Sequence, residues 1–177
     1  MIGWLQGQIA EPWQHANRCG VLLVCHGVGY EVHLSSRHWR ELPAVGSDLT
    51  LHVHHNVRED AWTLYGFPAR PERDLFRELV AVSGIGPQMA LALIGALPME
   101  DLIRAIVHGD LRLLTQAPGV GKRTAERLSV ELRQRLHQRF LGLVDAAALA
   151  DLELTGAPPS GAQSPGGDHR EEVQITL

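Results

Sequence analysis

Two short glycine segments of this chain have the composition of anion-binding turns. Ser83-Gly84-Ile85-Gly86-Pro87 and Pro118-Gly119-Val120-Gly121-Lys122 share a Gly-apolar-Gly centre, and their first glycines lie 35 positions apart. Glycine has no Cβ, so it can adopt a positive φ and let another backbone approach closely. A helix that follows such a turn begins with unpaired N–H groups and the positive end of its dipole. Two such turns, held rigidly, suit the phosphates of a nucleic acid.

We expect the residues of the two turns to divide the work of binding. Ile85 and Val120 would anchor each turn in the core, and the flanking amides would meet phosphate. Basic residues follow only the second turn, whereas the first has the neutral Gln88. Such contacts read the backbone, so binding should be sequence-independent and strongly salt-dependent. The predicted DNA-binding positions here are Gly84, Ile85, Gly86, Gln88, Gly119, Val120, Gly121, Lys122, Arg123 and Arg127.

Two other kinds of phosphate or metal site are excluded by the residues present. A P-loop needs glycine at position 116 and serine or threonine at 123, where this chain has Gln116 and Arg123. Strand alternation places His52 and His54 on one face and His55 on the other, with no obvious third zinc ligand. We interpret these histidines as a solvated strand face, and we expect no metal and no cofactor.

A third segment, Arg58-Glu59-Asp60, combines one charge that attracts phosphate with two that repel it. The common explanation for such residues is a polar β-turn. A binding role for Arg58 would have to operate beside the repulsion from Glu59 and Asp60.

The net charge of −4 is unevenly distributed along the chain. Residues 1–66 have a net charge of −2, residues 67–144 of +3, and residues 145–177 of −5. Between Arg112 and Arg139 there are seven basic residues and two acidic ones. Because local charge governs attraction to phosphate, the segment that contains the glycine turns favours nucleic acid.

The first 66 residues have the pattern of a small β-barrel. Runs rich in β-branched and aromatic residues, separated by glycine and proline, predict strands at residues 2–10, 21–26, 30–34, 49–57 and 62–67, with a short helix at 36–42. Five short strands indicate a closed barrel of the OB type. All four tryptophans lie here; they could stack on bases, but we favour core and interface packing because the segment is acidic. Cys19 and Cys25 fit small buried strand residues.

Residues 67–144 have a helical period and predict a tandem helix-hairpin-helix domain of five helices. Pro71 suits a helix start, Gly109 a helix end, and Asp110 the cap of the next helix.

Residues 145–170 are rich in glycine, proline, serine and alanine and predict a disordered linker. Residues 171–177 would begin a truncated C-terminal helical domain. The sequence has no membrane-spanning run and no signal peptide, so we expect a cytoplasmic protein.

Taken together, these segments resemble the RuvA family, the Holliday-junction-binding subunits of the bacterial branch-migration machine. The resemblance covers residues 1–144 in the right order, and it is most specific where the Arg-Glu-Asp segment is combined with the opening barrel. It is carried by Met1-Ile2-Gly3, residues 27–33, Val57-Arg58-Glu59-Asp60-Ala61, residues 64–67, residues 84–87 and residues 118–128.

The resemblance implies a homotetramer, with an octamer left open, that holds a four-way junction open and square during recombination and DNA repair. Arg58 would be a DNA contact, and Glu59 and Asp60 would match the family's acidic pin near the crossover. It implies RuvB as the partner that carries the ATPase and RuvC as the resolvase partner. The domain that engages RuvB would be the truncated one, so this chain should bind junctions but couple poorly to the motor.

Two other functions fit parts of the pattern. A helix-hairpin-helix repair enzyme, a glycosylase or lyase, would use the turns only for docking, but the helix after the second turn offers only Glu126 and Glu131 as carboxylates. A single-strand-binding OB module would bind through the tryptophans. With no nucleophile–base pair that the sequence justifies, we expect a non-catalytic DNA-binding subunit.

Overall fold

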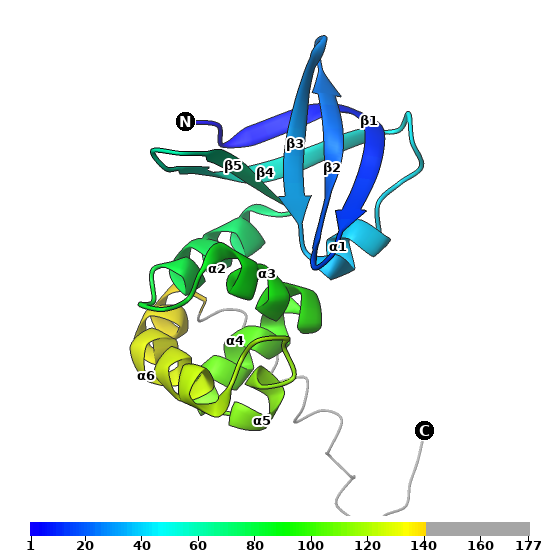
Figure 1. Ribbon diagram of the computed structural model, residues 1–177. Helices are drawn as coiled ribbons and strands as arrows, with labels where there is room; N and C mark the ends of the chain where they lie inside the picture. The colour runs from blue at the N-terminus through cyan, green and yellow to red at the C-terminus, as the bar shows by residue number, and fades with distance from the viewer. Residues whose placement is uncertain (141–177) are drawn as a thin grey trace, which may run out of the picture.

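The structure is a computed structural model of the chain that describes residues 1–140. A β-barrel lies beside a helical domain, and a short connection after β5 joins them (Figure 1). The elements, in chain order, are β1 (Trp4–His15), β2 (Arg18–Cys25), β3 (Val28–Leu34), α1 (Ser36–Arg40), β4 (Asp48–Val57), β5 (Trp62–Phe67), α2 (Arg70–Val80), α3 (Pro87–Ala96), α4 (Met99–His108), α5 (Leu111–Leu114) and α6 (Lys122–Arg139).

The five strands form a closed barrel in the order β1-β2-β3-β5-β4. All neighbouring pairs are antiparallel except β3 and β5, which pair in parallel at Val32↔Leu64 and His33↔Tyr65. Alternate residues point inward and form the barrel core, which includes Ile9, Leu23 and Val53. The predicted OB-type barrel is therefore confirmed.

Strand β1 extends five residues beyond its predicted end at residue 10. It pairs with β4 from Trp4 to Gln8 and then with β2 from Gln8 to His15. The register shifts between Ile9 and Glu11, as at a β-bulge. A bulge bends the strand and breaks the two-residue alternation, which is why the sequence pattern ends early although the strand continues.

The helical domain follows local capping signals in the sequence. Gly109 ends α4 in the left-handed region, with φ +74°, as a C-cap glycine should. Asp110 then caps α5, because its side chain accepts hydrogen bonds from the backbone N–H groups of Arg112 and Leu113. Helix α5 is a single short turn that ends at Leu114. The tandem helix-hairpin-helix architecture is confirmed.

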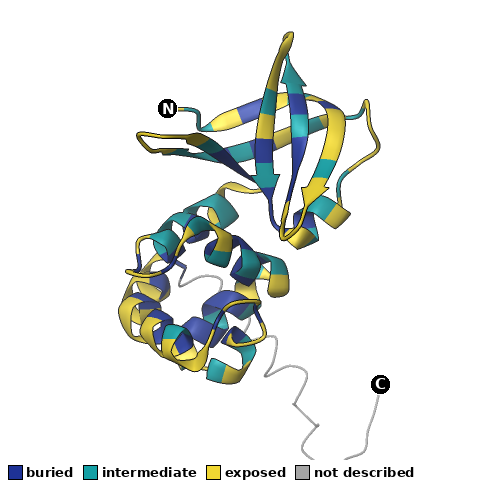
Figure 2. Ribbon diagram, in the orientation of Figure 1, coloured by how far each residue is buried: buried dark blue, intermediate teal, exposed yellow. Residues whose placement is uncertain are grey.

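The barrel and the helical domain have separate cores that meet at β5. Leu64 packs inside the barrel, whereas Tyr65 and Phe67 belong to the core of the helical domain. The Phe76 ring of α2 lies 5.1 Å from the Tyr65 ring and 5.0 Å from the Phe67 ring, measured between centroids. Buried residues line the inner side of the helices, and exposed residues cover α6 on the outside (Figure 2). Strand β5 therefore anchors the helical domain to the barrel.

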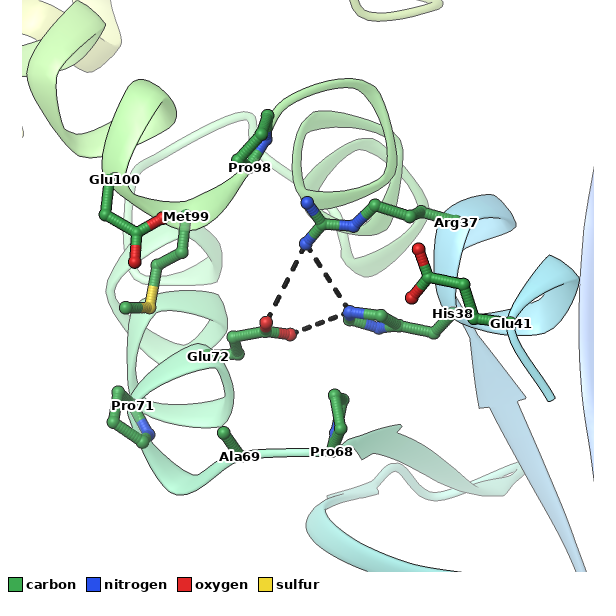
Figure 3. A pocket seen from close by; sticks show the side chains of 10 residues that line it. All are labelled: Arg37, His38, Glu41, Pro68, Ala69, Pro71, Glu72, Pro98, Met99 and Glu100. Carbon is green, nitrogen blue, oxygen red and sulfur yellow. Dashed lines mark hydrogen bonds and ion pairs between the residues drawn. The ribbon is translucent and has the colours of Figure 1, made fainter. Parts of the chain in front are cut away.

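A polar contact between α1 and α2 also joins the barrel to the helical domain. Arg37 and His38 of α1 point toward Glu72 of α2 (Figure 3). The distances are 2.8 Å between His38 Nε2 and Glu72 Oε2 and 3.7 Å between Arg37 Nη2 and Glu72 Oε1. These three residues line a pocket, which two further acids, Glu41 and Glu100, also line. This acidic junction is suited to holding the two parts together, not to binding phosphate.

The histidines of β4 do not form the solvated strand face that the sequence indicated. His54 is half-buried: its ring lies 5.3 Å from that of Phe76, and its Nδ1 atom accepts a hydrogen bond from Arg77 Nε at 3.4 Å. His55 Nδ1 accepts from the backbone N–H of Ile2 at 3.2 Å. The packing of α2 on the barrel covers this face, which strand alternation alone cannot reveal. Within residues 1–140, no group of three potential ligands could hold a metal ion.

The tryptophans and cysteines are divided between packed and open positions. Trp13 and Trp39 are partly buried, but Trp4 and Trp62 are 51% and 77% exposed, so core packing describes only the first pair. Cys19 is buried as expected, and Cys25 is partly buried.

No helix in the described part of the chain has the length and apolarity to cross a membrane. The predicted linker at 145–170 and the helical start at 171–177 lie outside the described residues.

Candidate nucleic-acid interface

The two glycine turns have the same backbone conformation. Gly84 and Gly119 both adopt a positive φ, at +85° and +81°. In each turn the next amide closes a tight loop: Ile85 N–H donates to the Val82 carbonyl at 3.0 Å, and Val120 N–H donates to the Ala117 carbonyl at 3.1 Å. Only glycine adopts this φ without strain. The repeat seen in the sequence is therefore also a repeat in three dimensions.

The apolar residue at the centre of each turn is fixed in the core of the helical domain. Ile85 and Val120 are only 5% and 6% exposed. The glycines on either side of them are exposed, at the surface of the same domain. Each turn thus has a buried anchor and an open backbone, so its amides are held in place before any ligand arrives.

The helices after the turns begin without side-chain caps. Gly86 and Gly121 are the N-cap residues of α3 and α6, and neither helix start has a side-chain hydrogen bond. The first intrahelical bonds run from Ala90 N–H to Gly86 O and from Ala125 N–H to Gly121 O, each 3.0 Å long. The amides that precede these bonds have no acceptor among the described residues, as an anion site at a helix start would require. They belong to Gln88, Met89, Lys122, Arg123 and Thr124.

Fixed positive charge at the second turn comes from the first residues of α6. Lys122 and Arg123 are exposed, and neither forms an ion pair with another described residue. The corresponding position of the first turn holds Gln88, which is exposed and neutral. If α3 and α6 alone supplied charge, the two turns would be unequal.

Arg127 of α6 changes that balance, because its side chain reaches the first turn. Its Nη1 atom donates a hydrogen bond to the Ser83 carbonyl at 2.8 Å. A Cβ atom added to Gly84 would lie 3.0 Å from the same nitrogen. The sequence suggested that Arg127 belongs to the second turn, because it lies only four positions after Arg123. A contact across 44 residues has no local signal in the sequence.

Two other arginines that could have compensated for Gln88 are engaged elsewhere. Arg73 Nη2 lies 2.9 Å from Asp74 Oδ1, and Arg77 donates to His54 at the barrel interface. The basic side chain that the structure places at the first turn is therefore that of Arg127.

An ion-pair network joins the C-terminal part of α6 to α2. Glu78 of α2 pairs with Arg135 at 3.4 Å and with Arg139 at 2.5 Å, and Arg139 also lies 3.5 Å from Asp74. Burial acts to raise the pKa of the Asp74 carboxyl, but the hydrogen bond from Arg73 and the charges of Arg73, Arg139 and Arg77 lower it overall. Asp74 therefore remains ionised within this network at neutral pH.

The Arg-Glu-Asp segment forms the turn between β4 and β5, which projects from the barrel (Figure 1). The backbone N–H of Arg58 donates to the Ala61 carbonyl at 2.9 Å and closes the turn. Arg58, Glu59 and Asp60 are exposed, and their side chains form no ion pair with any residue described. The structure thus leaves these charges free for an external partner, but it does not bring them into contact with the glycine turns.

Comparison with known proteins matches both parts of this architecture. The family model described as RuvA N terminal domain matches residues 1–66. The model described as SAM-like Helix-hairpin-helix tandem matches residues 76–134. A relative from Synechococcus sp. (strain CC9311) is 50% identical over 167 residues, which are 89% of this chain and 76% of the relative. The chain belongs to the RuvA family.

Two other RuvA proteins show how far the similarity extends. One from Prochlorococcus marinus (strain MIT 9313) is 57% identical over 136 residues, which are 77% of this chain but 60% of the relative. One from Synechococcus elongatus is 45% identical over 177 residues, the whole of this chain and 80% of the relative. All three relatives are named Holliday junction branch migration complex subunit RuvA. The chain therefore spans only part of the length of these RuvA proteins.

The two matched family models together include each segment of the candidate interface. The RuvA N terminal domain covers the β4–β5 turn, and the helix-hairpin-helix tandem covers both glycine turns and Arg127. Family membership supports the fold, and the individual contacts to DNA stay predictions that the geometry of the turns supports.

Proposed function

We propose that this RuvA family member binds four-way junction DNA independently of sequence, as a non-catalytic subunit. The observation that carries the proposal is the pair of congruent glycine turns. Each presents open backbone amides beside an exposed or bridging basic side chain. Phosphate is the group that such amides and charges recognise together.

The two turns would grip one duplex arm through its backbone. Gly84 and Gly119 remove the side-chain bulk at the point of approach, and the amides after Gly86 and Gly121 would donate to phosphate oxygens. Lys122 and Arg123 would neutralise charge at the second turn, and Arg127 at the first. None of these contacts distinguishes one base from another, so affinity would depend on salt and hardly on sequence.

Preference for a junction requires a second feature, which the β4–β5 turn supplies in our proposal. Arg58 would contact DNA near the crossover, while Glu59 and Asp60 would act as the acidic pin. A carboxylate and a phosphate about 4 Å apart repel each other by about 1 kcal/mol in water and by about 4 kcal/mol at an effective dielectric constant of about 20. Repeated around the axis of a homotetramer, this repulsion would keep strands apart and hold the junction open and square.

The name of these relatives, a subunit of a Holliday junction branch migration complex, guides the rest of the proposal. The open junction would be the substrate on which a partner motor, RuvB, performs ATP-driven branch migration, and RuvC would be the resolvase partner. The chain would work in the cytoplasm during recombination and repair. Its own part would be to hold and shape DNA.

A gel-shift comparison at matched salt tests the central claim. The purified protein is titrated onto a four-way junction and onto a linear duplex with the same arm length, and the mass of each complex is measured. We expect tighter binding to the junction and a mass with four protein copies per junction. Equal affinity for the two DNAs would reject junction recognition, and a single protein copy per junction would reject the tetramer.

Single-strand binding is a second candidate, favoured by the exposure of Trp4 and Trp62 on the barrel. Exposed tryptophans can stack on unpaired bases. Oligo(dT) that quenches tryptophan fluorescence and competes with the junction at similar concentration would support this candidate. Competition only at a large excess would leave the junction as the preferred ligand.

A further inference from the structure

A groove runs between the barrel and the helical domain, beside both glycine turns. It has a volume of about 830 Å³. On the barrel side it is lined by Asn17 and Arg18, at the tight turn that joins β1 to β2. On the helical side it is lined by Gln88 of α3 and by Gly119 of the second glycine turn. The β1–β2 turn is thus placed opposite the proposed DNA-binding turns.

The charge of this groove is unusual for the chain. No aspartate or glutamate lines it, although the sequence contains 20 acidic residues and the barrel segment is net acidic. Its one charged lining residue is Arg18, which is exposed and forms no ion pair with any residue in the described part of the chain. Polar side chains, among them Asn17 and Gln88, line other positions. The groove therefore offers hydrogen-bond donors and one free cation, with no opposing negative charge in its lining.

The position of the β1–β2 turn relative to α3 is fixed by close packing nearby. Gly95 of α3 approaches Ser36 at the start of α1 so closely that an added Cβ would lie 2.8 Å from Ser36 Oγ. The β2 strand that begins at Arg18 also packs against α1. The barrel turn is consequently held at a set distance from the helix whose first turn carries Gln88.

We infer that the β1–β2 turn is a third backbone contact for the duplex arm that the glycine turns hold. Arg18 contacts a phosphate across the groove from Gln88 and supplies charge that the first residues of α3 lack. Asn17 lies at the same edge and donates from its side-chain amide. This inference rests on the proposed DNA binding, and it extends the proposed site from the helical domain onto the barrel.

A salt titration with matched arginine variants tests this contact. The affinity of the wild type, Arg18→Ala and Arg40→Ala for one linear duplex is measured from about 50 to about 200 mM salt. Arg40 is the control, because it is an exposed arginine of the same barrel that does not line the groove. We expect Arg18→Ala to reduce the slope of log K against log salt by about 0.9, the value for one phosphate contact. Arg40→Ala should keep the wild-type slope.

A gain of charge gives the complementary measurement. Asn17 is exposed at the groove edge, so Asn17→Lys should steepen the same slope by about 0.9 and tighten binding at low salt. Melting temperatures of all variants are compared first, because Arg18, Asn17 and Arg40 are exposed and their substitution should leave folding intact.

The outcomes separate the inference from the proposed function. If wild-type protein binds neither duplex nor junction, the proposed function itself fails. If wild type binds and Arg18→Ala has the same slope as Arg40→Ala, the third contact is rejected while the glycine turns remain. If Arg18→Ala changes the mass of the free protein and leaves the slope unchanged, the groove is an interface between copies of this chain, and the inference is overturned.

Discussion

At the scale of single residues, the candidate site depends on two glycines that have no side chain, Gly84 and Gly119. Gly84 and Gly119 adopt a positive φ, and in the proposed function their lack of a side chain lets phosphate approach the backbone. Around Gly119 no other atom lies within 4 Å of an added Cβ, whereas at Gly84 such an atom would meet Arg127. A side chain at Gly119 would therefore obstruct only the ligand, apart from its effect on backbone strain.

Gly119→Val should weaken duplex and junction binding at least tenfold without changing the preference between them. The side chain enters the space proposed for phosphate, and the positive φ adds strain of about 1–2 kcal/mol. Gly46→Val is the matched control, because Gly46 also has a positive φ, at +88°, with open space around it, and lies in the loop before β4. Gel shifts at fixed salt and urea unfolding measure both. Similar losses of affinity in the two variants would show that strain, not obstruction, is responsible.

Neutralising the β4–β5 turn should have the opposite effect on affinity. The double substitution Glu59→Gln with Asp60→Asn removes two exposed acids that form no ion pair within residues 1–140. With the repulsion gone, we expect tighter binding to all DNA and a smaller ratio between junction and duplex affinities. The ratio is measured by competition at one salt concentration. Weaker binding would mean that these acids support the fold of the turn instead.

At the scale of elements, helix ends position the site. The N-termini of α3 and α6 have no side-chain caps, whereas Asp110 caps the neighbouring helix α5. Helix α6 is tied to α2 through Glu78 and Asp74. The two helix starts that we propose to bind phosphate are thus uncapped, while ion pairs at the other end of α6 join it to α2.

Asp110→Ala should lower the free energy of unfolding by about 1 kcal/mol, because two backbone N–H groups of α5 lose their acceptor. Urea unfolding measures the change. Glu126→Ala is the control, since Glu126 is an exposed acid of α6 with no ion pair among the described residues. The cap has no structural role if the two variants unfold at the same urea concentration.

At the scale of the whole molecule, the two cores are coupled through the aromatic contact between β4, β5 and α2. Tyr65, Phe76 and His54 pack together there, and Glu72 joins the parts on the other side. This coupling gives the barrel turns and the glycine turns a defined relation. DNA binding that used both the barrel turns and the glycine turns would need this defined relation.

This contact predicts a loss of stability in mild acid. Burial, together with the charges of Arg77, His55 and Arg73, lowers the pKa of His54 below its usual value of 6.5. The unfolded chain therefore takes up a proton at His54 near pH 6.5, where the folded chain resists it. Since the unfolded state then binds more protons, the free energy of unfolding falls as the pH drops from about 6.5 through the folded pKa.

Urea unfolding at pH 7.5 and pH 5.5 tests this expectation. His54→Gln should lose less stability between these two pH values than the wild type. Some pH dependence should remain, because burial and the charge of Arg18 also lower the pKa of His33. Equal losses in wild type and His54→Gln would show that the pH sensitivity arises elsewhere.

Features that depend on contacts within a few residues could be predicted from the sequence, whereas features that depend on contacts between distant segments could not. The C-terminal end of α4 and the start of α5 were predictable because Gly109 and Asp110 act on the backbone next to them. The extent of β1 was not, because its last residues are held by pairing with β2 beyond a bulge. The burial of His54 was missed for a similar reason, since α2 covers it from more than 20 residues away.

The sequence by itself determined the two turns, the open helix starts after them and the excess of basic residues around the second turn. These properties arise within a few residues, from the conformational freedom of glycine and the order of polar and apolar positions. Only the tertiary structure decided which side chains meet at each turn. It brought Arg127 of α6 to Ser83 and placed Arg18 of the barrel across a groove from Gln88. Packing between distant segments sets these neighbours, and no local pattern of residues encodes them.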